Sequence, residues 1–194
     1  MQGTLLILGA GGHGKAVAEA ALLSGIWKKV AFVDDRWPNL RTVFGLPVIS
    51  NIAGLSDISS QWEAAIAAVG QNSLRQQWLK VIRTAGLASA TVVHPSACVS
   101  PSAVIGEGTA IMALAMIGVD VSIGECSIIN AHTTVDHDVR LGSFVHLGIG
   151  VHLAGGVQIG SNVWLQVGCC ASYGVVVADN VVYMPKTVLS SGCT

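Results

Sequence analysis

Residues 123–141 read IGECSIINAHTTVDHDVRL, and Ile123, Ile129, Val135 and Leu141 lie six residues apart within this stretch. The same spacing continues in both directions without a slip, and valine, isoleucine or leucine fills fifteen of its seventeen positions. The full series is Val93, Val99, Ile105, Ile111, Ile117, Ile123, Ile129, Val135, Leu141, Leu147, Leu153, Ile159, Leu165, Ala171, Val177, Tyr183 and Leu189.

This six-residue period decides the fold class. An α-helix repeats its apolar face about every 3.6 residues and a two-sided strand about every 2 residues, so neither fits. Hexapeptide repeats are typical of a β-helix, in which each repeat of a coil of short strands buries one aliphatic side chain. The sequence therefore predicts an all-β, parallel β-helix over residues 93–194.

Residues 1–92 lack the six-residue period, which predicts a separate N-terminal domain. Apolar runs that alternate with helical patterns in this region favour a small α/β fold of the Rossmann type. The expected elements are strands at Thr4–Leu8, Val30–Val33, Pro47–Ile49 and Ala64–Val69, and helices from about Lys15 to Ser24 and from about Ser73 to Thr84.

A glycine-rich loop joins the first expected strand to the first expected helix. It reads GAGGHG at residues 9–14, which is GxGxxG spacing, and Asp34 follows Gly14 by twenty residues. Glycines let the backbone approach a ligand, and a helix N-terminus offers free N–H groups to a phosphate. The loop predicts a nucleotide-like ligand, although it is also compatible with a tight turn that binds nothing. The domain is small for NAD.

Two further polar segments are expected at the same edge of the N-terminal sheet. Asp34 and Asp35 end the second strand, and their carboxylates suit a sugar hydroxyl or a base N–H. Gly70-Gln71-Asn72 follows the strand at Ala64–Val69, and the carboxyl ends of parallel strands meet where such folds bind ligands. Asn72 taken alone is expected to be a helix N-cap.

The chain is apolar for its length, with 52% hydrophobic and only 11% charged residues. Residues 141–178 contain no Asp, Glu, Lys or Arg at all. A membrane span needs about 20 predominantly apolar residues, but histidines, glutamines, asparagine and recurrent glycines interrupt this stretch. We therefore expect no membrane insertion, and we interpret the charge-free stretch as an interface between copies of the chain.

Net charge is −1, and no basic cluster exceeds Lys28-Lys29, which argues against nucleic-acid binding. The first residues lack the basic segment of a signal peptide. The cysteines at positions 98, 126, 169, 170 and 193 form no CxxC pair and are odd in number, so we expect small buried side chains in a reducing compartment. The expected location is the cytoplasm.

Polar chemistry in the coil concentrates between Asn130 and Asp138. A histidine flanked by acids, as His137 is by Asp136 and Asp138, suits a general base because a carboxylate orients the imidazole. Neighbours on a strand face opposite ways, so Asp138 reaches His137 only at a corner or bend. No spacing resembles a zinc site or a serine hydrolase motif, so no metal is expected. A polar histidine in a repeat protein is more often structural, and His94 is interpreted so.

These motifs resemble the PglD/NeuD-like sugar acyltransferases, bacterial enzymes with a small Rossmann-like domain and a left-handed β-helix. The resemblance covers nearly the whole chain. It is carried by LLILGAGGHG at residues 5–14, INAHTTVDHD at residues 129–138, GSFVH at residues 142–146 and LAGGVQIG at residues 153–160.

The resemblance implies a homotrimer with active sites between neighbouring β-helices and acetyl-CoA lying along the coils. It implies that His137 is the catalytic base, that Asp138 raises its basicity, and that Asn130 lies near the acceptor. The implied acetyl-CoA contacts are His146, the Gly155 backbone N–H, Val167 and Pro185. The implied nucleotide-sugar contacts are Gly11, Gly12, His13, Asp34, Asp35 and Gly70.

Two features depart from the family. The acid after the histidine is Asp138 rather than the longer glutamate of some members, and the chain ends SGCT at residues 191–194 without the family's Gly-x-Pro-Ala-Lys ending. Coenzyme contacts from such a tail are not carried over, and the sequence leaves open whether the native chain extends beyond Thr194.

The expected function is acetyl-CoA-dependent N-acetylation of a UDP-4-amino-sugar type of nucleotide-linked sugar in bacterial glycan biosynthesis, by direct transfer. Two alternatives stay open: O-acetylation of a sialic-acid-type or other sugar hydroxyl, and a non-catalytic trimeric scaffold that binds nucleotide sugar.

Overall fold

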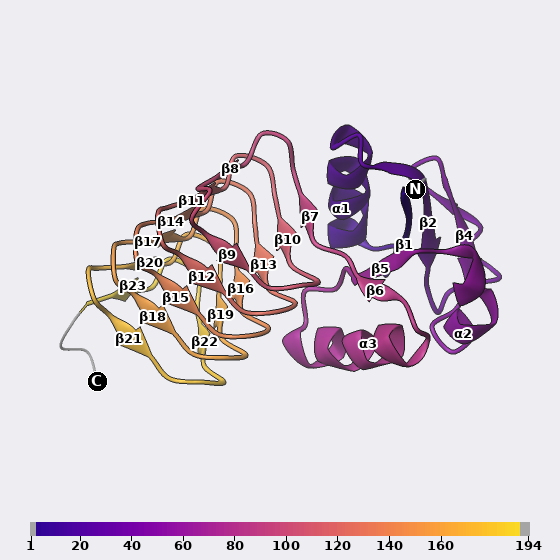
Figure 1. Ribbon diagram of the computed structural model, residues 1–194. Helices are drawn as coiled ribbons and strands as arrows, with labels where there is room; N and C mark the ends of the chain where they lie inside the picture. The colour runs from indigo at the N-terminus through magenta and orange to yellow at the C-terminus, as the bar shows by residue number, and fades with distance from the viewer. Residues whose placement is uncertain (1–2, 191–194) are drawn as a thin grey trace. The chain divides into compact units, whose positions relative to one another are not determined.

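The computed structural model describes residues 3–190 and divides into two compact units after Val93. The predicted boundary after residue 92 differs from this division by one residue. The fold class is confirmed, because a small α/β unit precedes a parallel coil of short strands (Figure 1).

The first unit holds a six-stranded sheet in the order β3-β4-β2-β1-β5-β6, parallel except for the β3–β4 hairpin. A short strand, β7 (Val92–Val93), ends the unit. The elements are β1 (Gly3–Leu8), α1 (Gly12–Leu23), β2 (Trp27–Val33), β3 (Thr42–Val43), β4 (Leu46–Ser50), α2 (Leu55–Ile58), the 3₁₀ turn η1 (Ser59–Gln61), β5 (Ala64–Ala67), α3 (Asn72–Thr84) and β6 (Ala88–Ser89).

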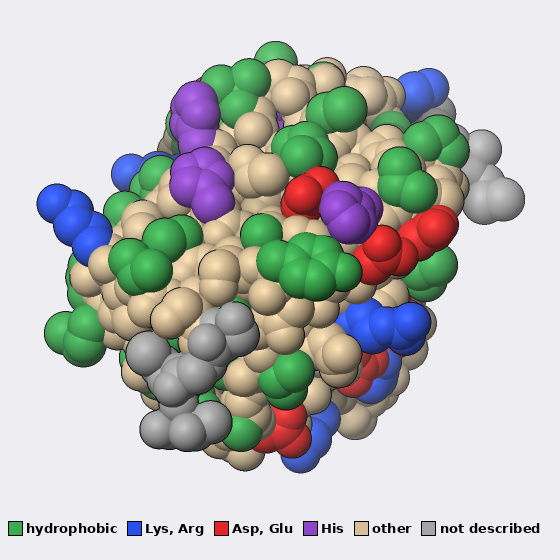
Figure 2. All heavy atoms as spheres, turned by 90° about the vertical axis from the view of Figure 1, so that its left-hand side faces the viewer, with side chains coloured by type: hydrophobic (Ala, Val, Ile, Leu, Met, Phe, Trp, Pro, Cys, Tyr) green, Lys and Arg blue, Asp and Glu red, His purple; other side chains and the backbone are tan. Residues whose placement is uncertain are grey.

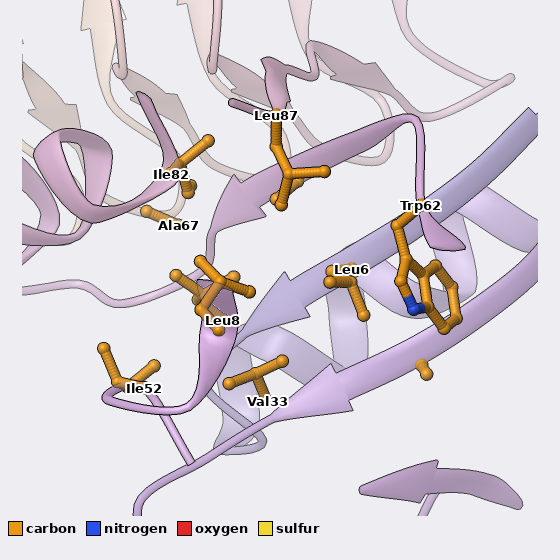
Figure 3. Packing of buried hydrophobic residues seen from close by; sticks show 11 residues of the cluster. Leu6, Leu8, Val33, Ile52, Trp62, Ala67, Ile82 and Leu87 are labelled. Carbon is orange, nitrogen blue, oxygen red and sulfur yellow. The ribbon is translucent and has the colours of Figure 1, made fainter. Parts of the chain in front are cut away.

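Helices cover both faces of this sheet, which is why its central strands are continuous apolar runs rather than alternating ones. Leu6, Leu8 and Val33 pack with Ile82 of α3 on one face (Figure 3). Phe32 points to the other face, where a Cβ built on Gly14 of α1 would lie 3.5 Å from its ring. The sheet therefore has a buried core on each side.

The structure corrects several boundaries. Helix α1 begins at Gly12 rather than Lys15, so the last glycines of the loop are already helical. Helix α3 begins at Asn72, and its N-cap is Gln71, so the prediction that Asn72 is the N-cap is wrong. The Asn72 side chain instead accepts a hydrogen bond of 2.8 Å from the fully buried Arg75.

The second unit is a coil in which strands stack parallel at intervals of eighteen residues, for example Ile111 on Ile129 and Ile129 on Leu147. Three hexapeptides thus complete one turn of the coil. The strands are β8 (Cys98–Val99), β9 (Val104–Ile105), β10 (Ala110–Ile111), β11 (Met116–Ile117), β12 (Ser122–Ile123), β13 (Ile128–Ile129), β14 (Thr134–Val135), β15 (Arg140–Leu141), β16 (His146–Leu147), β17 (His152–Leu153), β18 (Gln158–Ile159), β19 (Trp164–Leu165), β20 (Cys170–Ala171), β21 (Val176–Val177), β22 (Val182–Tyr183) and β23 (Val188–Leu189).

The six-residue period has two structural causes. The aliphatic residue of every repeat from Ile111 to Val177 is buried inside the coil. The second residue of every turn from Gly108 to Lys186 has a positive φ, which turns the chain through a corner. Each coil therefore has three flat faces and three corners.

The cysteines fit the expectation only in part. Cys126 and Cys169 are buried, but Cys98 is exposed and Cys170 is half-buried. Cys193 and the start and end of the chain lie outside the described residues. Among residues 3–190, no helix is long and apolar enough to cross a membrane.

Candidate active site

His137 and Asp138 form the turn at one corner of the coil, between β14 and β15. The φ of Asp138 is +60°, and this left-handed conformation brings its side chain back toward its neighbour. Nδ1 of His137 lies 2.8 Å from Oδ2 of Asp138. The requirement for a corner, inferred from strand geometry, is met.

The electrostatics of the corner favour a protonated imidazole. The hydrogen bond to Asp138, and next the negative charge of Asp136, raise the pKa of His137 above its ordinary value. Oδ2 of Asp136 lies 3.9 Å from Nε2 of His137, and Oδ1 of Asp136 accepts a 2.8 Å hydrogen bond from the His137 backbone N–H. When Nδ1 donates to Asp138, Nε2 carries the lone pair that accepts a proton.

Gly155 lies one coil beyond His137 at the same corner. A Cβ built on Gly155 would lie 2.5 Å from both Cε1 and Nε2 of His137, so the imidazole rests directly on the glycine backbone. The next residue, Gly156, donates its N–H to the carbonyl oxygen of His137 at 3.0 Å. Within residues 3–190, no acceptor is found for the Gly155 N–H, which leaves a donor beside the imidazole.

The other coil residues expected at the site lie elsewhere. Val167 and Pro185 stand in turns of a second corner, and Asn130 directly precedes that corner. Oδ1 of Asn130 accepts a hydrogen bond of 2.9 Å from the next backbone N–H. A single chain therefore does not bring these three residues to the corner of His137.

His146 belongs to β16, on the flat face opposite the corner of His137. It is buried, and its ring stacks on Trp164 with centroids 5.4 Å apart and planes 7° apart. Trp164, eighteen residues further on, was not singled out from the sequence, although this spacing alone predicts its contact with His146. Across residues 3–190, no three histidine, cysteine, aspartate or glutamate side chains converge as metal ligands would.

A second site lies at the glycine loop of the first unit, in a cleft of about 360 Å³. Gly9 has a φ of +99°, and a Cβ on Gly14 would collide with the Gly9 carbonyl oxygen, so both positions require glycine. The structure brings together the predicted residues Gly11, Gly12, His13, Asp34 and Gly70. The described residues that line the cleft are Gly9, Gly11, Gly12, His13, Asp34, Arg36, Ala68, Val69, Gly70 and Trp78.

Arg36 and Trp78 line this cleft but were missed from the sequence. Arg36 directly follows the Asp34-Asp35 pair, which is a signal that could have indicated it. Its Nε and Nη2 donate to the two oxygens of Asp34 at 2.7 and 2.9 Å. The hydrogen bond from Arg36 is the largest cause that lowers the pKa of Asp34 to about 2, and the Ala10 N–H also contributes.

Hydrogen bonds within the first unit hold Asp35 and the Gly70 loop in place. Asp35 does not line the cleft, and its Oδ1 accepts a hydrogen bond of 3.0 Å from the Ile52 N–H. The buried guanidinium of Arg75 donates to the carbonyl oxygens of Val69 and Gly70 at 3.0 and 3.2 Å. This arginine fixes the loop that forms one wall of the cleft.

Comparison with known proteins gives matches over both units. The family model of the PglD N-terminal domain matches residues 4–82. A curated relative, UDP-N-acetylbacillosamine N-acetyltransferase of Bacillus subtilis, is 35% identical over 113 residues, which are 55% of this chain. The match spans 50% of that relative's length.

Two solved structures match nearly end to end. The acetyltransferase domain of PglB from Neisseria gonorrhoeae, in complex with acetyl coenzyme A, is 34% identical over 99% of this chain and 95% of that chain, with a TM-score of 0.92. A histidine mutant of perosamine N-acetyltransferase from Caulobacter crescentus, in complex with CoA and GDP-perosamine, is 36% identical over 98% of this chain and 92% of that chain, with a TM-score of 0.85.

Proposed function

The chain belongs to the PglD/NeuD-like sugar acyltransferase family, and we propose that it transfers the acetyl group of acetyl-CoA to the amino group of a nucleotide-linked sugar. Two of the similar proteins are named as N-acetyltransferases, and one of them was solved with GDP-perosamine. The single observation that carries the chemistry is the His137–Asp138 pair seated on the backbone of Gly155. The particular amino sugar is left to experiment.

His137 is the general base of the proposed reaction. A sugar amine is protonated in neutral solution and must lose a proton before its lone pair attacks the thioester carbonyl. Nε2 takes that proton while Asp138 holds Nδ1 and stabilises the imidazolium that forms. The carbonyl oxygen then carries negative charge, and the N–H of Gly155 is positioned to donate to it. Collapse of this intermediate expels the CoA thiolate, and the second proton that the nitrogen must lose passes to this thiolate, which leaves the neutral amide and CoA thiol.

Placing both substrates together contributes more than the base does. Proximity and orientation supply about 7–11 kcal/mol, whereas a general base contributes about 10²–10⁴-fold, or roughly 3–6 kcal/mol. The binding of acetyl-CoA is assigned to His146, Gly155, Val167 and Pro185, and that of the acceptor to Asn130 and the cleft of the first unit.

We propose that the protein is a homotrimer, and the positions of these residues support this. His137 stands at one corner of the coil, whereas Val167 and Pro185 stand at another and His146 lies on the opposite face. A second copy packed against the corner of His137 is the way to complete one site from these parts. Backbone and uncharged side chains make up much of the surface seen in Figure 2, and the hydrophobic side chains of Ile149 and Val167 are about half exposed. Burial in an interface removes this apolar surface from water.

The experiment is turnover of the His137→Ala variant, measured as release of CoA thiol with a panel of nucleotide-linked amino sugars and hydroxyl sugars. We expect kcat to fall by about 10²–10⁴-fold while the affinities for both substrates change little. His152→Ala is the matched control, because His152 is an exposed histidine of the same coil with no assigned role. Near-normal kcat in His137→Ala contradicts the base. Wild-type turnover of hydroxyl sugars alone indicates O-acetylation, and binding without turnover indicates a scaffold.

A further inference from the structure

Two charged side chains, Asp34 and Arg36, line the glycine-loop cleft. The acceptor sites of the Asp34 carboxylate are occupied, whereas the Arg36 guanidinium keeps N–H donors for a ligand. We propose that Arg36 binds the diphosphate of the nucleotide-linked substrate and that Asp34 is the residue that positions Arg36. This inference rests on the proposed function for the identity of the ligand. It reverses the expectation that Asp34 itself contacts the nucleotide sugar.

Asp34 has no remaining capacity to accept a hydrogen bond from a sugar. Its Oδ1 accepts from the backbone N–H of Arg36 at 3.0 Å and from Nε at 2.7 Å. Its Oδ2 accepts from Nη2 of Arg36 at 2.9 Å and from the N–H of Ala10 at 2.8 Å. A carboxylate offers about four lone-pair sites, and all four are occupied here.

Arg36 keeps the donors that Asp34 does not use. A guanidinium has about five N–H bonds, and two of them go to Asp34. The remaining three include both N–H bonds of Nη1 and one of Nη2, which together form the edge that pairs with two phosphate oxygens. The bidentate contact with Asp34 fixes the plane of the guanidinium before a ligand arrives, so little rotamer entropy remains to be lost on binding.

Exposure decides which charge of the pair a ligand meets. The side chain of Arg36 is 59% exposed, whereas that of Asp34 is 12% exposed. Arg36 is also the one lysine or arginine among the described residues that line the cleft. An anion that enters the cleft therefore meets the cation first.

The rest of the cleft fits the same ligand. Helix α1 begins at Gly12, and the first N–H groups of a helix lack intrahelical acceptors and favour negative charge. Cβ atoms built on Gly11 and Gly12 would meet nothing within 4 Å, so a ligand has room to approach this backbone. Ala68, Val69 and Trp78 form an uncharged wall suited to a base or sugar. The diphosphate is placed between the helix N-terminus and Arg36.

Calorimetric titration of the full chain tests this assignment without requiring turnover. The probes are UDP and GDP, each compared with its nucleoside, and the proteins are wild type, Arg36→Ala, Arg36→Lys and Arg41→Ala. Arg41→Ala removes an exposed arginine of the same unit that does not line the cleft. The wild type should prefer a diphosphate to its nucleoside, and Arg36→Ala should lower diphosphate affinity about 10- to 100-fold, the range for hydrogen bonds between charged groups.

Arg36→Lys should recover only part of this affinity, because an ammonium cannot pair with two oxygens in the fixed plane of a guanidinium. Arg41→Ala should bind like the wild type. In turnover assays, Arg36→Ala should raise KM for the nucleotide-linked sugar but leave KM for the free amino sugar and for acetyl-CoA unchanged. The proposal is overturned if Arg36→Ala keeps the wild-type preference for diphosphates, or if the wild type shows none. Absence of acetyl transfer with intact diphosphate binding would instead contradict the proposed function.

Discussion

Replacing Gly155 by alanine should disable the proposed base without removing it. The added Cβ would lie 2.5 Å from Cε1 and Nε2 of His137, whereas carbon atoms in contact normally lie about 3.5–4.0 Å apart. The φ of Gly155 is not positive, and Val119, His137 and Tyr173 occupy the equivalent position in neighbouring coils. The backbone therefore accepts a side chain here, and the imidazole is what has to move.

The size of the effect follows from the geometry. Relieving the contact requires the imidazole to shift by about 1 Å, and a misplacement of about 1 Å costs about 10²-fold in rate. The shift also strains the 2.8 Å hydrogen bond between His137 and Asp138, so the pKa of His137 should fall toward its ordinary value. We expect kcat to fall about 100-fold, while KM for both substrates changes little.

Three measurements check this prediction. Release of CoA thiol gives kcat and KM, and an NMR titration of the imidazole gives the pKa of His137 in the wild type and in Gly155→Ala. The double variant His137→Ala/Gly155→Ala separates the ring from the backbone N–H. With the ring absent, the alanine should cost no further activity.

Two results would refute this reasoning. The first is a Gly155→Ala enzyme with kcat within about threefold of the wild type, because the predicted shift should cost about 10²-fold. The second is a further large loss when Gly155→Ala is added to His137→Ala. That loss would mean that the alanine acts on the Gly155 N–H or on binding rather than through the imidazole.

Three other predictions address the remaining parts of the structure. The pKa of His137 is raised by Asp138, so kcat/KM should rise with pH through a midpoint above about 6.5. Asp138→Asn should move this midpoint down and lower the plateau of kcat/KM. An unchanged midpoint in this variant would contradict the pairing of His137 with Asp138. Gly14→Ala should lower the free energy of unfolding of the first unit by about 1–3 kcal/mol or more, because the added Cβ collides with the Gly9 carbonyl oxygen. Chemical denaturation measures this free energy, and a wild-type value for the variant would rule out that contact. Light scattering at micromolar concentration should give the mass of a trimer, and a monomer would contradict the shared site.

The coil could be predicted from the sequence because one of the two causes of its period, the burial of an aliphatic side chain in every repeat, is visible in the residue types. Each repeat has one aliphatic position inside the coil, and Ile129, Leu147 and Leu165 repeat that position on successive levels. From the sequence, the contact between His137 and Asp138 could be predicted only on the condition that the two residues lie at a corner or bend of the coil. It depends on the positive φ of Asp138, and residues with side chains adopt this conformation at several corners, so glycine does not mark them.

The role of Asp34 could not be derived from motif spacing. An acid at the end of the second strand of a GxGxxG unit is usually associated with a ribose hydroxyl. In this chain Arg36, two residues further on, bonds to both oxygens of Asp34. A motif gives the position of the carboxylate, but the neighbouring side chains determine whether the carboxylate remains available to a ligand.

The eighteen-residue stacking also explains why the proposed site stands where it does along the coil. At the corner of His137, successive levels carry Val119, His137, Gly155 and Tyr173. A Cβ built on Gly156 would lie 3.8 Å from the ring of Tyr173, as one built on Gly155 would touch the ring of His137. Two glycines therefore lie between two aromatic rings at this corner, and Gly155 lacks the side chain that Val119, His137 and Tyr173 carry at the equivalent position. The proposed acetyl transfer uses the Gly155 N–H as a donor and a base beside it, and His137, on the level next to Gly155, is that base.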